Sequence, residues 1–277
     1  MPSIAKAPDF GSQKYWDQRF TANTAPFEWL SAPEALDPLI ADAIHASKEE
    51  RPQLLHAGCG SSQLSQHLKT HVESPHQVHN VDYSDVVIEA EKTRELASVG
   101  GSVDACATWD AVDLLDYASL TKACGHSMYS VIIDKSTADC ISCVDDVTCR
   151  LPYAISTRKG TVADGSVKAG LKSILIHPLP LLAVHLAYVA KPGAKWISIS
   201  YSTERFWFLD ENEAMSGKDD ASDDGVPDPR LLWSVVSTHQ IEAKEEVDGG
   251  RIAHKPKVYH CVYILQRTST PLFSNDG

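Results

Sequence analysis

Short apolar runs rich in β-forming residues alternate with helix-like segments along most of the chain, and this order constrains the fold more than any other feature. The apolar runs cover residues 53–58, 77–84, 102–109, 129–136 and 195–202. Segments with helical character lie between them at 61–72, 84–98 and 177–193. Strands that alternate with helices at this spacing form a largely parallel sheet with helices on its faces. We therefore expect an α/β, doubly wound, mostly parallel, Rossmann-like sheet that binds ligands outside the carboxyl ends of its strands.

The pattern changes after Pro229. Residues 231–243 and 259–268 are two strand candidates separated by a turn that contains Asp-Gly-Gly-Arg, which predicts a C-terminal antiparallel hairpin. Residues 144–173 show little recognisable regular structure in their first half, and we expect them to be an insertion beside the ligand cleft. The hydrophobic content of 43% is enough for one good-sized core, so we expect a single domain, 1–277.

Composition and charge exclude several classes of protein. The chain has no apolar run of about 18 residues or more and no recognisable secretory signal, and its seven cysteines are an odd number scattered along the sequence. A cytoplasmic protein without a membrane span is the expectation. The net charge of −12 disfavours nucleic acid as a partner. Residues 210–229 hold eight acids against one lysine, which is typical of a solvated loop and otherwise of a docking strip for a basic partner.

A turn with two glycines joins the first strand to the following helix. Gly58, Cys59 and Gly60 occupy the position at which a glycine loop approaches a cofactor, although Gly-Cys-Gly alone is equally consistent with a plain turn. Asp82 ends the second strand, 24 residues after Gly58, close to the offset at which an acid receives the hydroxyls of a ribose. It could instead cap the next helix, a role that Ser84 can also fill. We expect the backbone of Cys59 to serve the turn and its thiol to pack beneath the helix.

The end of the third strand adds a possible site for adenine. Trp109 could cover the face of the ring, and Asp110 could accept a hydrogen bond from the amino group. Three successive strand ends thus carry groups that could bind a ligand. The first has the glycines, the second has an acid for ribose, and the third has an acid beside an aromatic residue. This combination indicates an adenosine-containing cofactor.

The sequence resembles the seven-β-strand (class I) S-adenosylmethionine-dependent methyltransferases, and within them the methyltransferase-like group that includes the elongation-factor-1-alpha lysine methyltransferases. The resemblance is carried by YWDQRF at 15–20, PFEWL at 26–30, GCGSSQLS at 58–65, NVDYSDVVI at 80–88, WDAVDLLDY at 109–117 and VIIDKSTADCI at 131–141. It implies a seven-stranded sheet and S-adenosylmethionine as cofactor, with S-adenosylhomocysteine as product. In this sequence Phe20 replaces a tyrosine of the group's pattern and Ser136 replaces a glycine.

The resemblance assigns roles to individual residues. It places Trp16, Phe20 and Trp29 at the outer wall of the cofactor, Gly58 at its methionine side, and Asp82 with Tyr83 at ribose and adenine. Trp109 and Asp110 would flank the adenine, and Asp134 and Lys135 would lie at the end of the fourth strand near the reactive centre. Because three of these aromatics belong to residues 1–30, we expect that segment to act as a lid that excludes water.

Methyl transfer needs mainly alignment of the reacting groups in a dry cleft, so no dedicated nucleophile is expected. A base for a protonated acceptor could be Asp134, Asp139 or Tyr201, each of which could equally be structural. Cys140, Cys143 and Cys149 lack a fourth ligand, and we expect free thiols and no metal. The resemblance implies a protein lysine, such as one on an elongation factor, as the acceptor, and a small molecule is the alternative. A non-catalytic binding module with the same fold is the competing class.

Overall fold

The computed structural model describes residues 8–149, 151–155, 173–210, 227–243 and 257–274. Its strands are β1 (Leu54–Ala57), β2 (Val78–Asp82), β3 (Thr108–Ala111), β4 (Tyr129–Lys135), β5 (Val147–Cys149), β6 (Tyr153–Ile155), β7 (Ile174–Ile176), β8 (Ala190–Ser200), β9 (Trp233–Glu242), β10 (Tyr259–Arg267) and β11 (Leu272–Ser274). The α-helices are α1 (Gln13–Ala22), α2 (Asp37–Ser47), α3 (Leu64–Leu68), α4 (Asp85–Ser98), α5 (Tyr117–Cys124), α6 (Thr137–Ile141), α7 (Pro178–Val189) and α8 (Pro229–Leu232). Short 3-10 turns lie at Pro33–Leu36, Lys69–His71, Pro75–Gln77, Val103–Ala105 and Trp207–Leu209.

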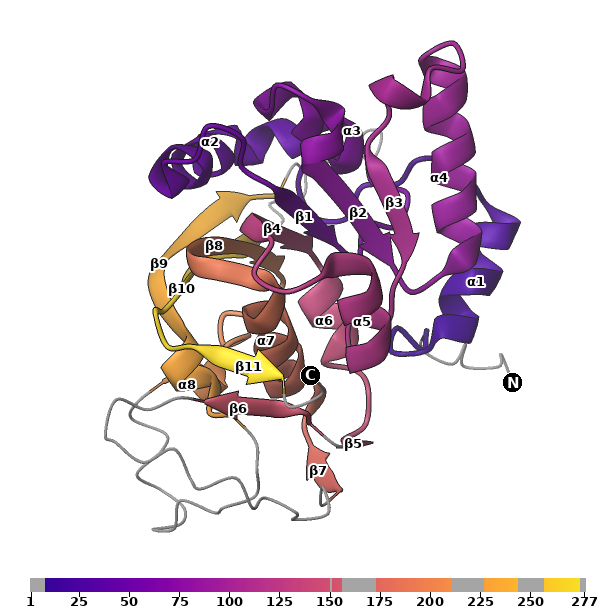
Figure 1. Cartoon of the computed structure of the whole chain (residues 1–277). Helices are drawn as coiled ribbons and strands as arrows, with labels where there is room; N and C mark the ends of the chain where they lie inside the picture. The colour runs from indigo at the N-terminus through magenta and orange to yellow at the C-terminus, as the bar shows by residue number, and fades with distance from the viewer. Residues whose placement is uncertain (1–7, 150, 156–172, 211–226, 244–256, 275–277) are drawn as a thin grey trace, which may run out of the picture.

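Seven of the described strands form one sheet in the order β3-β2-β1-β4-β8-β10-β9 (Figure 1). Strands β3, β2, β1, β4 and β8 are parallel, whereas β10 is antiparallel to both β8 and β9. The expected doubly wound sheet with a C-terminal antiparallel hairpin is therefore confirmed. The strand order reverses between β1 and β4, so the cleft of this sheet is expected beyond the carboxyl ends of these two strands.

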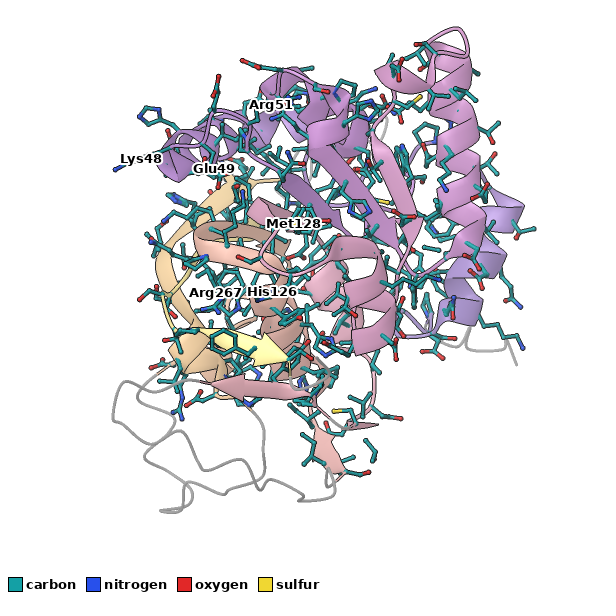
Figure 2. The ribbon with its side chains drawn as sticks, in the orientation of Figure 1. Lys48, Glu49, Arg51, His126, Met128 and Arg267 are labelled. Atoms are coloured by element: carbon teal, nitrogen blue, oxygen red, sulfur yellow. The ribbon has the colours of Figure 1, made fainter. Side chains whose placement is uncertain are left out.

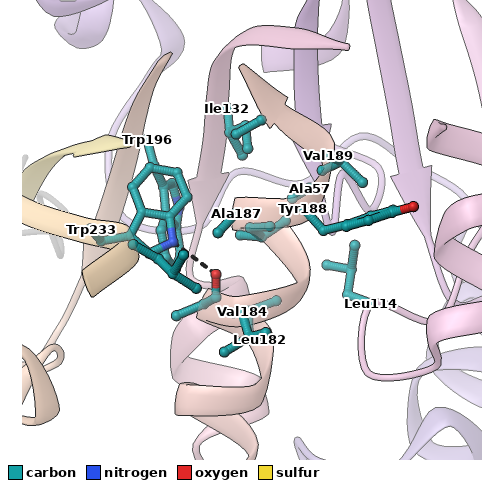
Figure 3. Close-up of a cluster of buried hydrophobic side chains, with 14 of the residues drawn as sticks. Ala57, Leu114, Ile132, Leu182, Val184, Ala187, Tyr188, Val189, Trp196 and Trp233 are labelled. Atoms are coloured by element: carbon teal, nitrogen blue, oxygen red, sulfur yellow. Dashed lines mark hydrogen bonds between the residues drawn. The ribbon is translucent and has the colours of Figure 1, made fainter. Parts of the chain in front are cut away.

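Alternate side chains of the central strands enter two separate cores, one on each face of the sheet. In β4, Val131 and Ile133 pack with α2 and α3, whereas Ile132 packs on the opposite face with α5 and α7. Both faces are covered, as the apolar strands of a parallel sheet require. On the α7 face, the indole of Trp233 packs against Trp196 and donates to the carbonyl of Ala183 at 2.8 Å (Figure 3).

A buried arginine joins the end of the sheet to the C-terminal segment. The side chain of Arg267, labelled in Figure 2, donates to the carbonyls of Ala187 at 2.9 Å, Thr268 at 3.0 Å and Thr270 at 2.8 Å. Nearby, Nε2 of His126 lies 3.2 Å from the carbonyl oxygen of Leu272 in β11. These contacts hold β11 beside β6, with which it pairs in an antiparallel manner.

Three predicted elements differ from the structure. The sequence predicts the third strand at 102–109, but β3 begins at Thr108. Residues before it form a 3-10 turn, in which Ala105 N–H donates a hydrogen bond to the Ser102 carbonyl. The helix expected at 61–72 begins only at Leu64, after a local turn in which Ser62 Oγ accepts from Leu64 N–H at 3.1 Å, and it continues after α3 as the 3-10 turn Lys69–His71. The helix expected at 177–193 ends at Val189, because Pro192 disfavours helix at and before its own position.

The insertion contains more structure than expected in its first half. Strand β5 pairs with β7, and β6 pairs with β11, each in an antiparallel manner. Residues 150 and 156–172 lie outside the described residues, as do residues 211–226 of the acidic tract.

Candidate functional site

A cavity of about 630 Å³ lies at the carboxyl ends of the central strands. Of the residues predicted for a cofactor site, its lining includes Trp16, Phe20, Trp29, Gly58, Cys59, Gly60, Asp82, Tyr83 and Lys135. Trp109, Asp110, Asp134 and Tyr201 are not part of the lining. The structure therefore brings most of the predicted set together at the position where the strand order reverses.

The turn after β1 needs glycine at two positions. Gly58 has φ of 65° and Gly60 has φ of 50°, both in the left-handed region that other residues rarely adopt. A Cβ at Gly58 would also lie 2.2 Å from the Thr137 hydroxyl oxygen, which itself donates to the Ala57 carbonyl at 2.9 Å. The thiol of Cys59 is buried among aromatic and aliphatic side chains, and burial raises its pKa well above the usual range. The thiol thus packs with side chains of α1 and α4, and not beneath the helix that follows the turn, where the sequence predicts it.

Asp82 connects the glycine turn to the start of α4. Its carboxylate accepts from Gly60 N–H at 2.9 Å and from Ser84 N–H at 3.0 Å. Burial raises the pKa of Asp82 to about 6, against the opposing effect of these backbone hydrogen bonds. A carboxylate offers about four lone-pair positions, so these bonds leave acceptor capacity for a hydroxyl group of a ligand in the cavity.

Aromatic side chains of the N-terminal segment cover one side of the cavity. Trp16 stacks on Phe20 with ring centroids 5.7 Å apart and meets Trp29 edge-on at 6.2 Å. The guanidinium carbon of Arg19 lies 4.8 Å from the ring of Phe27 and 5.5 Å from that of Trp29. All five residues line the cavity. This arrangement fits the lid expected from residues 1–30, of which 1–7 lie outside the described residues.

An ion pair attaches the same segment to the end of β4. The buried ammonium of Lys135 bonds the carboxylate of Glu28 and also donates to the carbonyl of Ser31 at 3.2 Å. Burial lowers the pKa of Lys135, and the charge of Glu28 opposes this effect. Glu28 further accepts from Ser62 Oγ at 3.0 Å, next to the glycine turn. Nothing in the sequence near Glu28 indicates these contacts.

Trp109 and Asp110, for which adenine contacts are predicted, lie outside the cavity lining. The indole N–H of Trp109 donates to Glu95 at 2.5 Å in the core beneath α4. Asp110 lies 3.0 Å from Nε2 of His79 on the other face. The reason is the later start of β3, which places both residues inside the strand, where neighbouring side chains point to opposite faces.

The residues that follow β3 line the cavity instead. Val112, Asp113 and Leu114 all contribute to it, and Asp113 accepts from Leu115 N–H at 2.9 Å. Burial raises the pKa of Asp113. Asp113 is thus the acid at this strand end, three residues after the predicted one, and only the true strand boundary could have identified it.

The three candidate bases lie outside the cavity lining and contact other parts of the fold. Asp134 is fully buried, accepts from Ala138 N–H at 3.1 Å and from the Trp196 indole at 2.7 Å, and has its pKa raised to about 6 by burial. Asp139 pairs with Arg205 at 2.6 Å. Tyr201 is exposed, its ring lying against that of His260 at 5.4 Å. Neither Asp134 nor Tyr201, the two predicted catalytic residues, belongs to the cavity lining, so their catalytic roles stay predictions.

Two buried polar atoms on the cavity lining have no hydrogen-bond partner among the described residues. They are Oγ of Ser136 and Nε2 of His185. Nδ1 of His185 lies 2.8 Å from the Leu114 carbonyl and must donate to it, so Nε2 carries a free lone pair. Burial lowers the pKa of His185 to about 4 and keeps it neutral. Buried polar atoms left in this state are suited to bind a polar ligand.

The fold is that of S-adenosylmethionine-dependent methyltransferases. A methyltransferase of this class from Anabaena variabilis aligns with 94% of this chain and 94% of its own, with a TM-score of 0.52 and 11% identity. The structure from the study of disulfide-to-thioacetal conversion in echinomycin biosynthesis aligns over 93% of each chain, with a TM-score of 0.50 and 15% identity.

In sequence, the chain is similar to Methyltransferase srdJ of Neurospora crassa. The two are 34% identical over 144 residues, which are 52% of this chain and 59% of srdJ. The chain thus matches about three-fifths of the length of this relative. No protein-family model matches the chain. No helix in the described part of the chain is long and apolar enough to span a membrane.

Proposed function

We propose that this chain is a methyltransferase that binds S-adenosylmethionine in the cavity beyond β1, β2 and β4. The observation that carries the proposal is the position of Asp82, whose buried carboxylate is bonded to Gly60 of the turn and faces the same cavity. The fold and the similarity to srdJ support it. Ser136 and His185 of the lining also support it, since Ser136 Oγ and His185 Nε2 have no hydrogen-bond partner among the described residues.

The residues of the chain have defined roles in this proposal. The cofactor supplies a methyl group on a positively charged sulfur, which is already activated for transfer. Asp82 accepts hydrogen bonds from ribose hydroxyls, and the backbone of the glycine turn lets the ligand approach closely. Trp16, Phe20 and Trp29 exclude water and present aromatic faces to a cation. Catalysis then depends on holding the acceptor in line with the methyl group.

The acceptor that we propose is a small, largely apolar molecule. The cavity lining also includes mostly apolar residues from the segment 141–151. They are Ile141, Val144, Val147, Cys149 and Leu151. Concave apolar sites with a few polar groups are typical of small-molecule ligands. The protein lysine suggested by the family resemblance is the alternative, and the acidic tract that would attract a basic protein lies mostly outside the described residues.

Incubation with methyl-labelled cofactor and a cell extract tests both points. We expect label in the small-molecule fraction with the parent chain and little label with Asp82→Ala. Asp110→Asn, which changes an acid outside the cavity, is the matched control and should label like the parent. Label in protein would instead indicate the lysine acceptor. Binding of S-adenosylhomocysteine by calorimetry without any labelling would indicate a binding module and contradict the proposal.

A further inference from the structure

Two histidines and an aspartate converge on the α2–α3 side of the molecule, in a group separate from the cavity lining. Nε2 of His67 lies 2.5 Å and Nε2 of His71 lies 3.0 Å from the same Oδ1 atom of Asp37. The two imidazole rings meet edge-on with centroids 5.4 Å apart. Within the described residues this is the one group of three side chains whose ligand atoms all lie within 4.8 Å of one another.

Local structure fixes the three side chains. His67 belongs to α3, and His71 follows four residues later in the 3-10 turn, so both rings project from the same side of one helical segment. Asp37 is the first residue of α2. The histidine side chains are about four-fifths buried, with exposed fractions of 19% and 15%, whereas that of Asp37 is 43% exposed.

We propose that Asp37, His67 and His71 bind a divalent first-row metal ion, for which zinc is the natural probe. Two imidazoles and a carboxylate are borderline donors that suit Zn²⁺ and its neighbours, whereas Mg²⁺ and Ca²⁺ prefer sites made of oxygen. With zinc bonds of about 2.0–2.2 Å, the ligand atoms of a tetrahedral site lie about 3.3 Å apart. The two Nε2 atoms lie 2.5 Å and 3.0 Å from Oδ1 of Asp37, so these side chains need to move apart only slightly to admit the ion. The exposed side of Asp37 leaves the fourth position to water.

The sequence alone predicts no metal here, because Asp37 lies 30 residues from His67 and completes no recognisable motif.

The site would fix α3 at its C-terminal end. Glu28 already holds the start of the segment through Ser62 Oγ at 3.0 Å. A bound ion between α2 and the α3 segment would therefore restrain the helix that leads out of the glycine turn. It should stabilise the folded chain, since an ion that binds only the folded state raises the unfolding temperature.

Calorimetric titration of the metal-free full chain with Zn²⁺ tests the proposal. We expect one zinc ion per chain and a raised unfolding temperature, with Mg²⁺ giving neither effect. His71→Asn and Asp37→Asn should each weaken zinc binding by more than about tenfold, since the loss of even an outer partner costs 10–100-fold. His76→Asn, which changes an exposed histidine outside the group, should bind zinc like the parent.

Circular dichroism in chelator shows whether each variant is folded before titration. No saturable zinc binding by the parent would show that the group is an ion-pair network only. Equal affinity in the parent, His71→Asn and Asp37→Asn would place the ion elsewhere, for example on the free cysteines, and would also overturn the proposal. Neither result bears on methyl transfer, which uses the separate cavity.

Discussion

The ammonium of Lys135 at the end of β4 bonds the carboxylate of Glu28, which precedes it by 107 residues. The side chain of Lys135 is 2% exposed and that of Glu28 is 25% exposed, so the pair is largely shielded from water. The N-terminal segment is thereby attached to the strand whose end lines the cavity.

Replacing Glu28 by Gln should therefore destabilise the chain. Removing one partner of a buried pair leaves an uncompensated charge, which typically costs about 3–5 kcal/mol. Because Glu28 is partly exposed, we expect about 1–3 kcal/mol in urea unfolding. The double variant Glu28→Gln/Lys135→Met should recover part of the loss.

Glu49→Gln is the matched control for this pair. Glu49 bonds Lys191 at 2.5 Å, but both side chains are about one-third exposed. Exposed pairs contribute about 0–1 kcal/mol, so this variant should unfold almost like the parent. Equal losses in Glu28→Gln and Glu49→Gln would contradict the importance of the buried pair.

The affinity for S-adenosylhomocysteine should depend on pH through Asp82. Ribose hydroxyls donate to the ionised carboxylate, and burial raises the pKa of this group to about 6. The affinity of the parent should thus fall as the pH is lowered through about 6. The variant Asp82→Asn should bind more weakly at neutral pH, by roughly 1.5–3 kcal/mol, and its affinity should not change with pH in this range. Calorimetry between pH 5 and 7.5 measures both. A pH-independent affinity in the parent would remove Asp82 from ribose binding.

The same raised pKa has a consequence for stability. A folded-state pKa above the unfolded value of about 3.9 means that the folded chain binds more protons between the two values. The contribution of Asp82 to the free energy of unfolding is therefore present below the unfolded pKa and is lost as the pH rises through about 6. Asp134, with a pKa likewise raised to about 6, acts in the same direction.

Trp29→Leu should discriminate between the two forms of the cofactor. The sulfur of S-adenosylmethionine is positively charged and that of the product is not, and an aromatic face attracts a cation by about 0.5–2 kcal/mol. We expect the variant to lose more affinity for S-adenosylmethionine than for S-adenosylhomocysteine. The guanidinium carbon of Arg19 also lies 5.5 Å from this ring. An equal loss of affinity for both ligands would therefore show that the ring interacts with Arg19 and not with the sulfur of the cofactor.

Ser136→Gly should stabilise the chain. Ser136 has φ of 66°, a left-handed conformation that costs a residue with a side chain about 1–2 kcal/mol relative to glycine. The free energy of unfolding should rise by about 1 kcal/mol. Lys48→Gly, at a φ of 56° in a helix cap outside the cavity, should give a similar gain. Reduced binding of S-adenosylhomocysteine in Ser136→Gly alone would show that the unpartnered hydroxyl contacts the ligand.

The architecture could be predicted from the sequence because local patterns determine it. The alternation of apolar runs and helices fixed the sheet class, and the glycines with Asp82 located the cavity. Trp109 and Asp110 lie outside the cavity lining because β3 follows a 3-10 turn and ends at Ala111 instead of at Trp109. Because the strand ends two residues later than predicted, Asp110 lies within β3 and contacts His79 on one face of the sheet, away from the cavity.

Contacts between distant segments could not be predicted from the sequence. Glu28 with Lys135, and Asp37 with His67, join residues 107 and 30 positions apart without any motif that links them. The free lone pair of His185 depends on which carbonyl its other nitrogen meets, and that carbonyl belongs to Leu114, 71 residues earlier. Such long-range contacts arise from the packing of the whole fold, so only the structure reveals them.

The attachment of the N-terminal segment has a kinetic consequence. The ring cluster of Trp16, Phe20 and Trp29 covers a cavity whose other sides are the strand ends, and Glu28 ties this cover to Lys135. Under the proposed function, S-adenosylhomocysteine would leave past these rings after each reaction. Opening of the segment would then be a step of every turnover, and its rate would set an upper limit on how often the reaction can repeat, however fast the methyl group moves.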